Sequence, residues 1–358
     1  MEMNKIRVLI VDDSPLVRKA FRLILQKDPA MEVVGEGKTG KEAIELTRDL
    51  QPNMILMDIQ MPEMNGLEAM AEIMATHPVP ILVITGQEVS HDEGSLYYQA
   101  LELGALDLIQ KPAVHDNHQF LLKKIRILSK VPVIRHIQRR NIPHPEKAPK
   151  TLRVSETSKE SFKKEIKIIL IGASAGGPRS LSLLLNELEK ELPFAFGISL
   201  HHPEGTTENL VQWLQKYSAL PVVGARNEEL LQEGRITVVP AGYHMVFDSQ
   251  GRIQLKKKTS SDIFVPSIDR MFKSAARVFG DSVAAILLSG MGDDGVEGMA
   301  EVLEKGGKTV VEDEASSLVY GMGKRAWESR VAQQKMEASE IGRWINSLGR
   351  TMRKFLSK

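Results

Sequence analysis

The chain has 358 residues, of which 42% are hydrophobic and 26% are charged, and its formal net charge is +1. This composition is typical of a globular protein with two ordinary domains, and so small a net charge gives no reason to expect nucleic acid or an acidic substrate as a partner. The absence of cysteine excludes disulfides, thiolate metal ligands and a cysteine nucleophile. The sequence opens with no secretory pattern and contains no apolar run that could span a bilayer, so we expect a cytoplasmic protein without membrane insertion.

Residues 1–128 alternate short apolar runs with amphipathic stretches, a pattern typical of a parallel sheet covered by helices. The predicted strands are residues 7–11, 31–34, 54–57, 80–84 and 107–109. The predicted helices are residues 15–27, 40–50, 66–76, 93–103 and 115–128. This alternation predicts a flavodoxin-like (βα)5 domain with the strand order 2-1-3-4-5.

Residues 129–165 differ in composition from the segments on either side. They hold ten Lys or Arg residues against four Asp or Glu residues, together with four prolines. Because proline interrupts both helices and sheets, this composition predicts a flexible, basic linker.

A second α/β pattern follows the linker and predicts a doubly wound, mainly parallel domain over residues 166–345. Its predicted strands are residues 166–171, 194–200, 235–239, 244–247, 252–255, 283–288 and 308–311. Its predicted helices are residues 177–190, 206–217, 267–279, 295–305 and 322–329. Residues 346–358 are expected to form a basic tail, as a loosely packed helix.

In the first domain, acidic and polar residues stand at the ends of the predicted strands. Asp12 and Asp13 end the first strand, Asp58 the third and Thr85 the fourth, and Lys111 follows the fifth. Because these strand ends meet at one edge of the sheet, the side chains are expected to share a pocket. Clustered carboxylates repel one another unless a cation joins them, and oxygen ligands suit Mg²⁺, with Asp58 the best placed nucleophile for a phosphoryl group.

These residues resemble those of response-regulator receiver domains. The matching pieces are residues 11–14, residues 57–66, Thr85 and residues 111–112. The resemblance implies that Asp58 accepts the phosphoryl group, and that Thr85 and Lys111 contact it and transmit its arrival. It also implies that Mg²⁺ is held by three carboxylates and a backbone carbonyl, from Asp12, Asp13, Asp58 and Gln60. Leu108 stands where the family often has an aromatic residue, which puts the usual aromatic switch in doubt.

In the second domain, a turn rich in small residues, residues 172–178, follows a predicted buried strand and precedes a helix. Small residues on both sides of Ser174 permit a sharp strand-to-helix turn that exposes the hydroxyl, and nearby N–H groups could bind an oxyanion or a phosphate. The turn has neither the Gly-Lys-Ser/Thr end of a phosphate-binding loop nor the G-x-G-x-x-G pattern of dinucleotide sites.

Other strand ends of this domain carry a base and an acid. His201 and His202 close the strand at 194–200, and Asp293 and Asp294 follow the strand at 283–288. A serine nucleophile needs a base, and the base needs a carboxylate that orients it. One histidine and one aspartate of these pairs would complete such a set with the serine.

The second domain resembles the catalytic domain of the chemotaxis protein-glutamate methylesterases over roughly residues 165–345. The matching pieces are residues 172–177, His201, residues 238–245, residues 266–269, residues 289–295 and residues 313–322. The resemblance implies Ser174 as nucleophile, His201 as base and Asp294 as the orienting acid, with no cofactor in this domain. Backbone N–H groups at Ala175 and Met291 are expected to stabilise the oxyanion.

Together the two resemblances imply a phosphorylation-activated enzyme that hydrolyses glutamate γ-methyl esters and deamidates glutamines on chemotaxis receptors. A chemotaxis histidine kinase would supply the phosphoryl group, and the unphosphorylated first domain is expected to obstruct the second. Departures from the family pattern at Ala175, His202 and Asp293 motivate an alternative, a phospho-regulated interaction module with a weak or decayed esterase. Control of DNA binding is a third possibility, but no helix-turn-helix pattern or basic recognition helix follows the linker.

Overall fold

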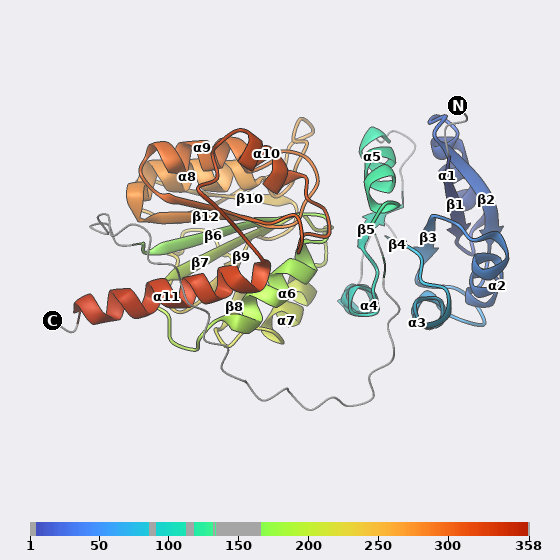
Figure 1. The fold of residues 1–358 in the computed structure, drawn as a ribbon, viewed down its shortest axis with the longest axis horizontal. Coiled ribbons are helices and arrows are strands. Elements are labelled where there is room, and N and C mark those ends of the chain that lie inside the picture. The colour runs from blue at the N-terminus through green and yellow to red at the C-terminus, as the bar shows by residue number, and fades with distance from the viewer. Residues whose placement is uncertain (1–4, 86–90, 112–117, 132, 134–165, 357–358) are drawn as a thin grey trace.

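The computed structural model describes residues 5–85, 91–111, 118–131, 133 and 166–356. Almost all of the predicted linker therefore lies outside the described residues. The described parts form two α/β domains, each built on its own parallel sheet (Figure 1).

The N-terminal domain has a five-stranded parallel sheet in the order β2-β1-β3-β4-β5, which confirms the predicted order. Its strands are β1 (Ile6–Val11), β2 (Met31–Gly37), β3 (Met54–Asp58), β4 (Ile81–Thr85) and β5 (Asp107–Gln110). Its helices are α1 (Pro15–Leu25), α2 (Gly40–Leu50), α3 (Gly66–Thr76), α4 (His91–Glu102) and α5 (Gln119–Leu128).

The central strands of this sheet are buried on both faces because helices cover both. Residues 8–11 of β1 and all of β3 are buried, as their continuous apolar sequence predicts. Side-chain caps set where two of the helices begin. Thr39 accepts from the Glu42 N–H ahead of α2, and Asn65 and Glu68 form a reciprocal capping box ahead of α3.

The C-terminal domain has a seven-stranded sheet in the order β14-β13-β12-β6-β7-β9-β8, and all of its strand pairs are parallel. The strands are β6 (Ile168–Ala173), β7 (Ala195–Leu200), β8 (Val222–Gly224), β9 (Ile236–Val238), β12 (Val283–Leu287), β13 (Lys308–Glu312) and β14 (Gln334–Met336). The edge strands β8 and β14 were not predicted, because three residues are too few to show a periodicity. A separate antiparallel hairpin consists of β10 (Tyr243–Phe247) and β11 (Ile253–Lys257).

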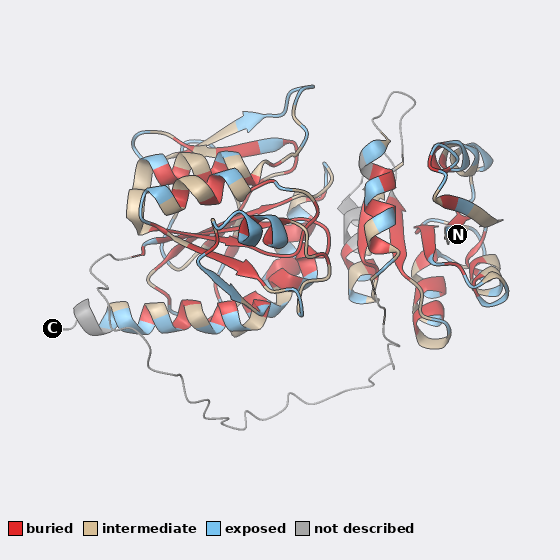
Figure 2. Ribbon diagram, turned by 45° about the horizontal axis from the view of Figure 1, so that its top comes forward, coloured by how far each residue is buried: buried red, intermediate tan, exposed pale blue. Residues whose placement is uncertain are grey.

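Helices cover both faces of this sheet, as a doubly wound fold requires. Figure 1 shows α6, α7 and α11 on one side of the sheet and α8, α9 and α10 on the other. Their bounds are α6 (Gly177–Glu187), α7 (Thr207–Gln215), α8 (Ile268–Phe279), α9 (Val296–Glu304), α10 (Met322–Glu328) and α11 (Ala338–Leu356), with a short 3₁₀ turn at Gly280–Ser282. Buried residues recur along these helices and alternate with exposed ones, as expected for helices that pack one face on a sheet (Figure 2).

The helix α11 differs from the predicted tail because it continues well past residue 346 and packs against α6. Ile341 and Ile345 on its inner face are fully buried, and Leu348 and Met352 extend that face along the helix. Arg350 forms an ion pair across the same contact, so the basic residues border an apolar seam and are not a free tail. Although α11 has 19 residues, no helix in the described parts of the chain is both long and apolar enough to cross a membrane.

Replacing Ile345 with alanine should lower the free energy of unfolding of the C-terminal domain by about 2–4 kcal/mol, because it leaves a cavity under α11. Tryptophan fluorescence in a denaturant titration follows this domain, since all three tryptophans lie beyond residue 165. The exposed neighbour Ser347 provides the control, and Ser347→Ala should change little. Equal stability of the Ile345→Ala and Ser347→Ala variants would show that α11 adds nothing to the core.

Candidate functional site

Ser174, His201 and Asp294 form one continuous chain of hydrogen bonds at the carboxyl edge of the C-terminal sheet. The Nδ1 atom of His201 lies 3.0 Å from Ser174 Oγ, and its Nε2 atom lies 2.9 Å from Asp294 Oδ2. Ser174 follows β6, His201 follows β7 and Asp294 follows β12, and these three strands are adjacent in the sheet. The topology therefore brings together residues that are up to 120 positions apart in the chain.

The turn that carries Ser174 depends on close backbone approach. The backbone N–H of Ser174 donates to the carbonyl of Ser289 at 3.0 Å, which ties the turn to the segment after β12. A Cβ atom on Gly290 would lie 2.9 Å from Ser174 Cβ, so only glycine fits there. Gly176 has a φ of +75° at the start of α6 and completes the sharp turn.

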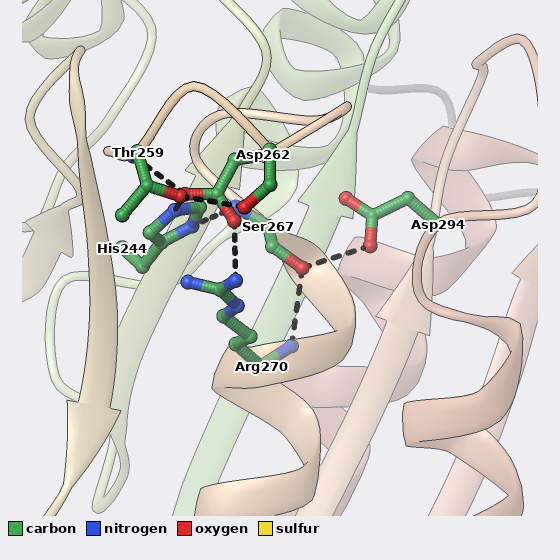
Figure 3. A network of polar contacts seen from close by, with 7 residues as sticks. His244, Thr259, Asp262, Ser267, Arg270 and Asp294 are labelled. Atoms are coloured by element: carbon green, nitrogen blue, oxygen red, sulfur yellow. Dashed lines mark hydrogen bonds and ion pairs between the residues drawn. The ribbon is translucent and has the colours of Figure 1, made fainter. Parts of the chain in front are cut away.

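The carboxylate of Asp294 lies at the N-terminus of α8, where it accepts three further hydrogen bonds. The backbone N–H groups of Ile268 and Asp269 donate at 2.8 and 2.9 Å. The Ser267 hydroxyl donates at 3.2 Å, the contact drawn in Figure 3. Burial would raise the pKa of Asp294, but the hydrogen bond and charge of His201 and these backbone donors outweigh it and lower the pKa. The carboxylate is therefore held ionised beside the imidazole.

The protonation state of His201 follows from its two partners. An ionised Asp294 accepts a hydrogen bond, so Nε2 carries the proton and Nδ1 presents a lone pair to the Ser174 hydroxyl. The Phe264 ring stacks on the imidazole, with a centroid distance of 5.3 Å and an interplanar angle of 10°. The imidazole is thus fixed from one face as well as through both nitrogens.

The geometry distinguishes between the alternatives at positions 201–202 and 293–294. His202 points to Thr206 Oγ1 at 2.9 Å and to the carbonyl of Val239 at 3.3 Å, away from the nucleophile. Burial lowers the pKa of His202 to about 4, so it carries no charge beside the base at neutral pH. Asp293 is exposed, and the buried carboxylate beside His201 is that of Asp294.

A second carboxyl group lies next to the triad acid. Asp269 follows the N-cap of α8, and its Oδ1 accepts the backbone N–H of Gly298 at 2.6 Å. Burial raises the pKa of Asp269 to about 6; the Gly298 hydrogen bond opposes the rise, and the charge of Asp294 adds to it. Asp269 therefore titrates close to neutral pH.

In the N-terminal domain the predicted acidic cluster is also assembled. Ligand atoms of Asp12, Asp13 and Asp58 all lie within 4.8 Å of one another. Lys111 Nζ lies 2.7 Å from Asp58 Oδ2 and 2.9 Å from Asp12 Oδ2. Burial raises the pKa of Asp58, and the ammonium of Lys111 opposes that rise. An oxygen-only cluster of this kind fits a hard divalent cation.

The other predicted residues of this site are described less fully. Thr85 ends β4 beside Gln110 of β5, and its side chain lies outside the described residues. The backbone N–H of Gln60 donates to Asp58 Oδ1 at 3.4 Å, which places Gln60 next to the cluster. Leu108, at the position of the family's frequent aromatic residue, is buried in the core.

Comparisons with known proteins match both domains. Residues 169–345 match the CheB methylesterase family, and residues 8–126 match the response regulator receiver domain family. A protein-glutamate methylesterase/protein-glutamine glutaminase 2 of Carboxydothermus hydrogenoformans is 37% identical, covering 97% of this chain and 100% of that protein. The protein of the same name from Anaeromyxobacter dehalogenans is 34% identical, covering 96% and 97%. The crystal structure of the Thermotoga maritima CheB methylesterase catalytic domain is 31% identical with a TM-score of 0.49, covering 51% of this chain and 99% of that one.

This chain belongs to the protein-glutamate methylesterase/protein-glutamine glutaminase family. Residues 8–126 belong to a receiver domain and residues 169–345 to a methylesterase-type domain.

The methylesterase-type domain contains a buried carboxylate that the sequence analysis missed. Glu312, at the end of β13, is 1% exposed and accepts the backbone N–H of Ser289 at 2.7 Å and the Ser316 hydroxyl at 3.1 Å. Since the Ser289 carbonyl binds the N–H of Ser174, Glu312 supports the nucleophile turn from behind. Burial raises its pKa. The sequence signal that could have identified Glu312 is its position, as an acidic residue at the end of a predicted strand.

The receiver and methylesterase-type domains also touch. Figures 1 and 2 show α4, β5 and α5 as the receiver elements nearest the other domain. Glu102 at the end of α4 accepts the indole N–H of Trp213 at 2.9 Å and pairs with Lys216 at 3.3 Å. Tyr98 stacks on the same indole at a centroid distance of 5.6 Å. The aromatic residues of this contact gave no motif, because each is an ordinary amphipathic helix residue in sequence.

Changing Asp269 to asparagine should stabilise the methylesterase-type domain at neutral pH but not in acid. The raised pKa means that the wild-type carboxyl contributes stability below its unfolded pKa near 4 and loses that contribution as pH rises through about 6. The stability difference between Asp269→Asn and wild type should therefore grow by about 1 kcal/mol from pH 4 to 7, allowing for solvent screening. The measurement is denaturant unfolding by tryptophan fluorescence across pH. Asp293→Asn controls for the lost charge, and a difference that stays constant with pH would contradict the prediction.

Proposed function

We propose that this chain hydrolyses glutamate γ-methyl esters and deamidates specific glutamines on methyl-accepting chemotaxis receptors, and so provides sensory adaptation. The observation that carries the proposal is the unbroken Ser174–His201–Asp294 chain in a domain of the methylesterase family. The names of the relatives support the substrate class. No observation favours the alternative of an interaction module with a decayed esterase, because the base and the acid are both in hydrogen-bonding contact.

Acyl transfer would use the side chains of Ser174, His201 and Asp294. Ser174 Oγ attacks the γ-carbonyl carbon while His201 Nδ1 takes its proton, and Asp294 stabilises the imidazolium that forms. His201 then returns the proton to the leaving methoxide, which departs as methanol. Water, deprotonated by the same nitrogen, hydrolyses the acyl-enzyme and restores the hydroxyl. For a glutamine substrate ammonia leaves in place of methanol.

The oxyanion would lie between two backbone segments that hydrogen bonds hold in place. Ala175 follows the nucleophile at the start of the turn, and Met291 follows the glycine that contacts Ser174. Backbone N–H groups at these two positions are suited to stabilise the negative charge, because both segments are held by hydrogen bonds before the reaction begins. The alanine at 175 leaves this backbone contribution intact.

Control would come from phosphorylation of Asp58 by a chemotaxis histidine kinase. Asp12, Asp13, Asp58 and the Gln60 carbonyl would hold Mg²⁺, which when bound neutralises charge on the phosphoryl group. Lys111 already contacts Asp58 and would pair with a phosphoryl oxygen, and Thr85 ends the neighbouring strand. We propose domain limits of 1–128 for the receiver and 129–165 for the linker, with the esterase domain running from 166 and including α11.

The contact between the domains supports obstruction by the docked receiver. Ala175, Met291 and Val319, which surround the nucleophile turn, share one hydrophobic cluster with receiver residues of α5. Ser174 itself is only 5% exposed. A cleft of about 470 Å³ remains between the domains, so the interface is incompletely packed and suited to reversible release. Phosphorylation would weaken the contact that the α4–β5–α5 face makes with the methylesterase-type domain, and so free the nucleophile.

The proposed reaction is tested by methanol release from methylated receptor membranes, with and without a small phosphodonor. Ser174→Ala should reduce release by about 1,000-fold or more, because the nucleophile is lost. Asp58→Asn should keep the basal rate and lose the stimulation by phosphodonor. No release by the wild type, on receptors that another methylesterase demethylates, would refute the proposed substrate.

Glu102→Ala should raise the basal methanol release of the unphosphorylated protein by about fivefold, because docking loses the contacts of Glu102 with Trp213 and Lys216, which together contribute about 1 kcal/mol. The fully phosphorylated rate should stay the same, so the phosphodonor stimulates the variant less. Glu102→Gln keeps an acceptor for the indole and should give a smaller effect. If Glu102→Ala and wild type have the same basal rate, the α4–α7 contact does not hold the domain closed.

A further inference from the structure

The loop between β11 and α8, residues 258–267, is anchored at several points beside the catalytic histidine. Its central anchor is Asp262, whose carboxylate accepts the Thr259 N–H at 2.7 Å and the Thr259 hydroxyl at 2.9 Å (Figure 3). Asp262 also forms an ion pair with Arg270 in the first turn of α8. The hydrogen bonds with Thr259 lower the pKa of Asp262, so it stays charged throughout the neutral range.

A buried histidine joins this loop to the hairpin and to the start of α8. His244 of β10 has no exposed surface, and its Nδ1 accepts the backbone N–H of Ser267 at 3.0 Å. The proton must then be on Nε2, which donates to Asp262 at 3.1 Å. The first residue of the loop, Lys258, forms an ion pair with Glu204, which follows the catalytic histidine by three positions. The loop is therefore tied at its beginning, middle and end.

Between these anchors two neighbouring apolar residues face different surroundings. Phe264 lies over the catalytic imidazole, with a centroid distance of 5.3 Å. Ile263 is 84% exposed and is the most exposed large hydrophobic side chain among the described residues. Ile263 remains exposed although the receiver domain is docked, so the receiver domain does not cover this side chain. A single exposed apolar residue is common on protein surfaces, but this one directly precedes the residue that stacks on His201, in an anchored loop.

We propose that Ile263 is a specificity-determining residue that contacts an apolar side chain of the protein substrate next to the ester-bearing glutamate. The proposal rests on the proposed esterase function and assigns the substrate contact of the same site. Phe264 ties the loop to His201, so a substrate side chain against Ile263 would bring its neighbouring ester towards Ser174. The anchors through Asp262 and His244 reduce the entropy lost when the substrate binds, since the loop is ordered beforehand.

The contact would act on a protein substrate and not on a small ester, because a small ester fills only the reaction centre. Burial of an isoleucine side chain at the centre of a contact changes binding by about tenfold or more. Ile263→Ser should therefore lower kcat/KM for methylated receptor about tenfold, mainly by raising KM. The rate at which a fluorophosphonate probe labels Ser174 should change less than about twofold, since that reaction depends on the triad alone.

The experiment compares wild type, Ile263→Ser, Ile263→Leu and Leu230→Ser, as full-length proteins activated with phosphodonor. Ile263→Leu should retain receptor activity because it keeps the apolar surface. Leu230→Ser removes a 48% exposed leucine from a pocket lined by Ile168, at the opposite end of β6 from the nucleophile, and should behave as wild type. These two variants distinguish a local contact from a general loss of surface hydrophobicity.

Three outcomes would overturn the inference. Unchanged receptor kcat/KM in Ile263→Ser would show that the residue does not contact substrate. Equal losses in receptor hydrolysis and probe labelling would show that it acts only through the stacked Phe264. A loss as large in Leu230→Ser would show no local contact. Absence of methanol release by the wild type, with normal probe labelling, would refute the proposed substrate and is distinguishable from each of these.

Discussion

The ionised carboxylate of Asp294, buried at the N-terminus of α8, makes the interactions on which the rest of the proposed catalytic site depends. A carboxylate 2% exposed would be neutralised unless donors replaced its water, and here the donors are two backbone N–H groups, a serine hydroxyl and the imidazole. The positive end of the helix adds to their effect. The direction of His201 towards Ser174, and therefore its basic lone pair, follows from this one fixed charge.

The position of α8 in turn depends on the packing of its inner face. Ile268, Met271 and Phe272 on its inner face have no exposed surface, and they fix the height of the helix over β6 and β12. At its first turn the Ser267 hydroxyl both caps the helix and donates to Asp294, while the Ser267 N–H is held by His244. Core packing, helix capping and the proposed catalysis thus depend on the same few residues.

The turn that carries Ser174 also has two structural roles. It must be close to the segment after β12 to position Ser174, and it also lies in the apolar cluster that includes receiver residues. Asp58, in contrast, is on β3, and β4 lies between β3 and the interface strand β5 in the sheet. A change at the proposed phosphorylation site must therefore act through the neighbouring strands and α4, because the Asp58 carboxylate itself makes no contact with the other domain.

Much of this arrangement could be predicted because it is local or follows from sheet topology. The strand order of the receiver, and the convergence of Asp12, Asp58 and Lys111, follow from apolar periodicity and from the rule that functional groups gather at carboxyl ends. The resemblance to known families selected His201 over His202, which spacing left open. Edge strands of three residues gave no periodic signal. The apolar inner face of α11 was not recognised because arginines are interspersed with its apolar residues in the sequence.

By itself the sequence determined the two-domain α/β organisation, which strands are followed by functional residues, and the types of those residues. These features depend on patterns within short windows of the chain. Only the tertiary structure decided which nitrogen of His201 faces Ser174, that Glu312 supports the nucleophile turn, and that the loop at 258–267 holds Phe264 over the imidazole. Only it paired Glu102 with Trp213, 111 positions away. The physical reason is that each of these contacts joins segments distant in sequence, and their distance and direction are set by how helices and sheets pack and not by any local preference of the chain.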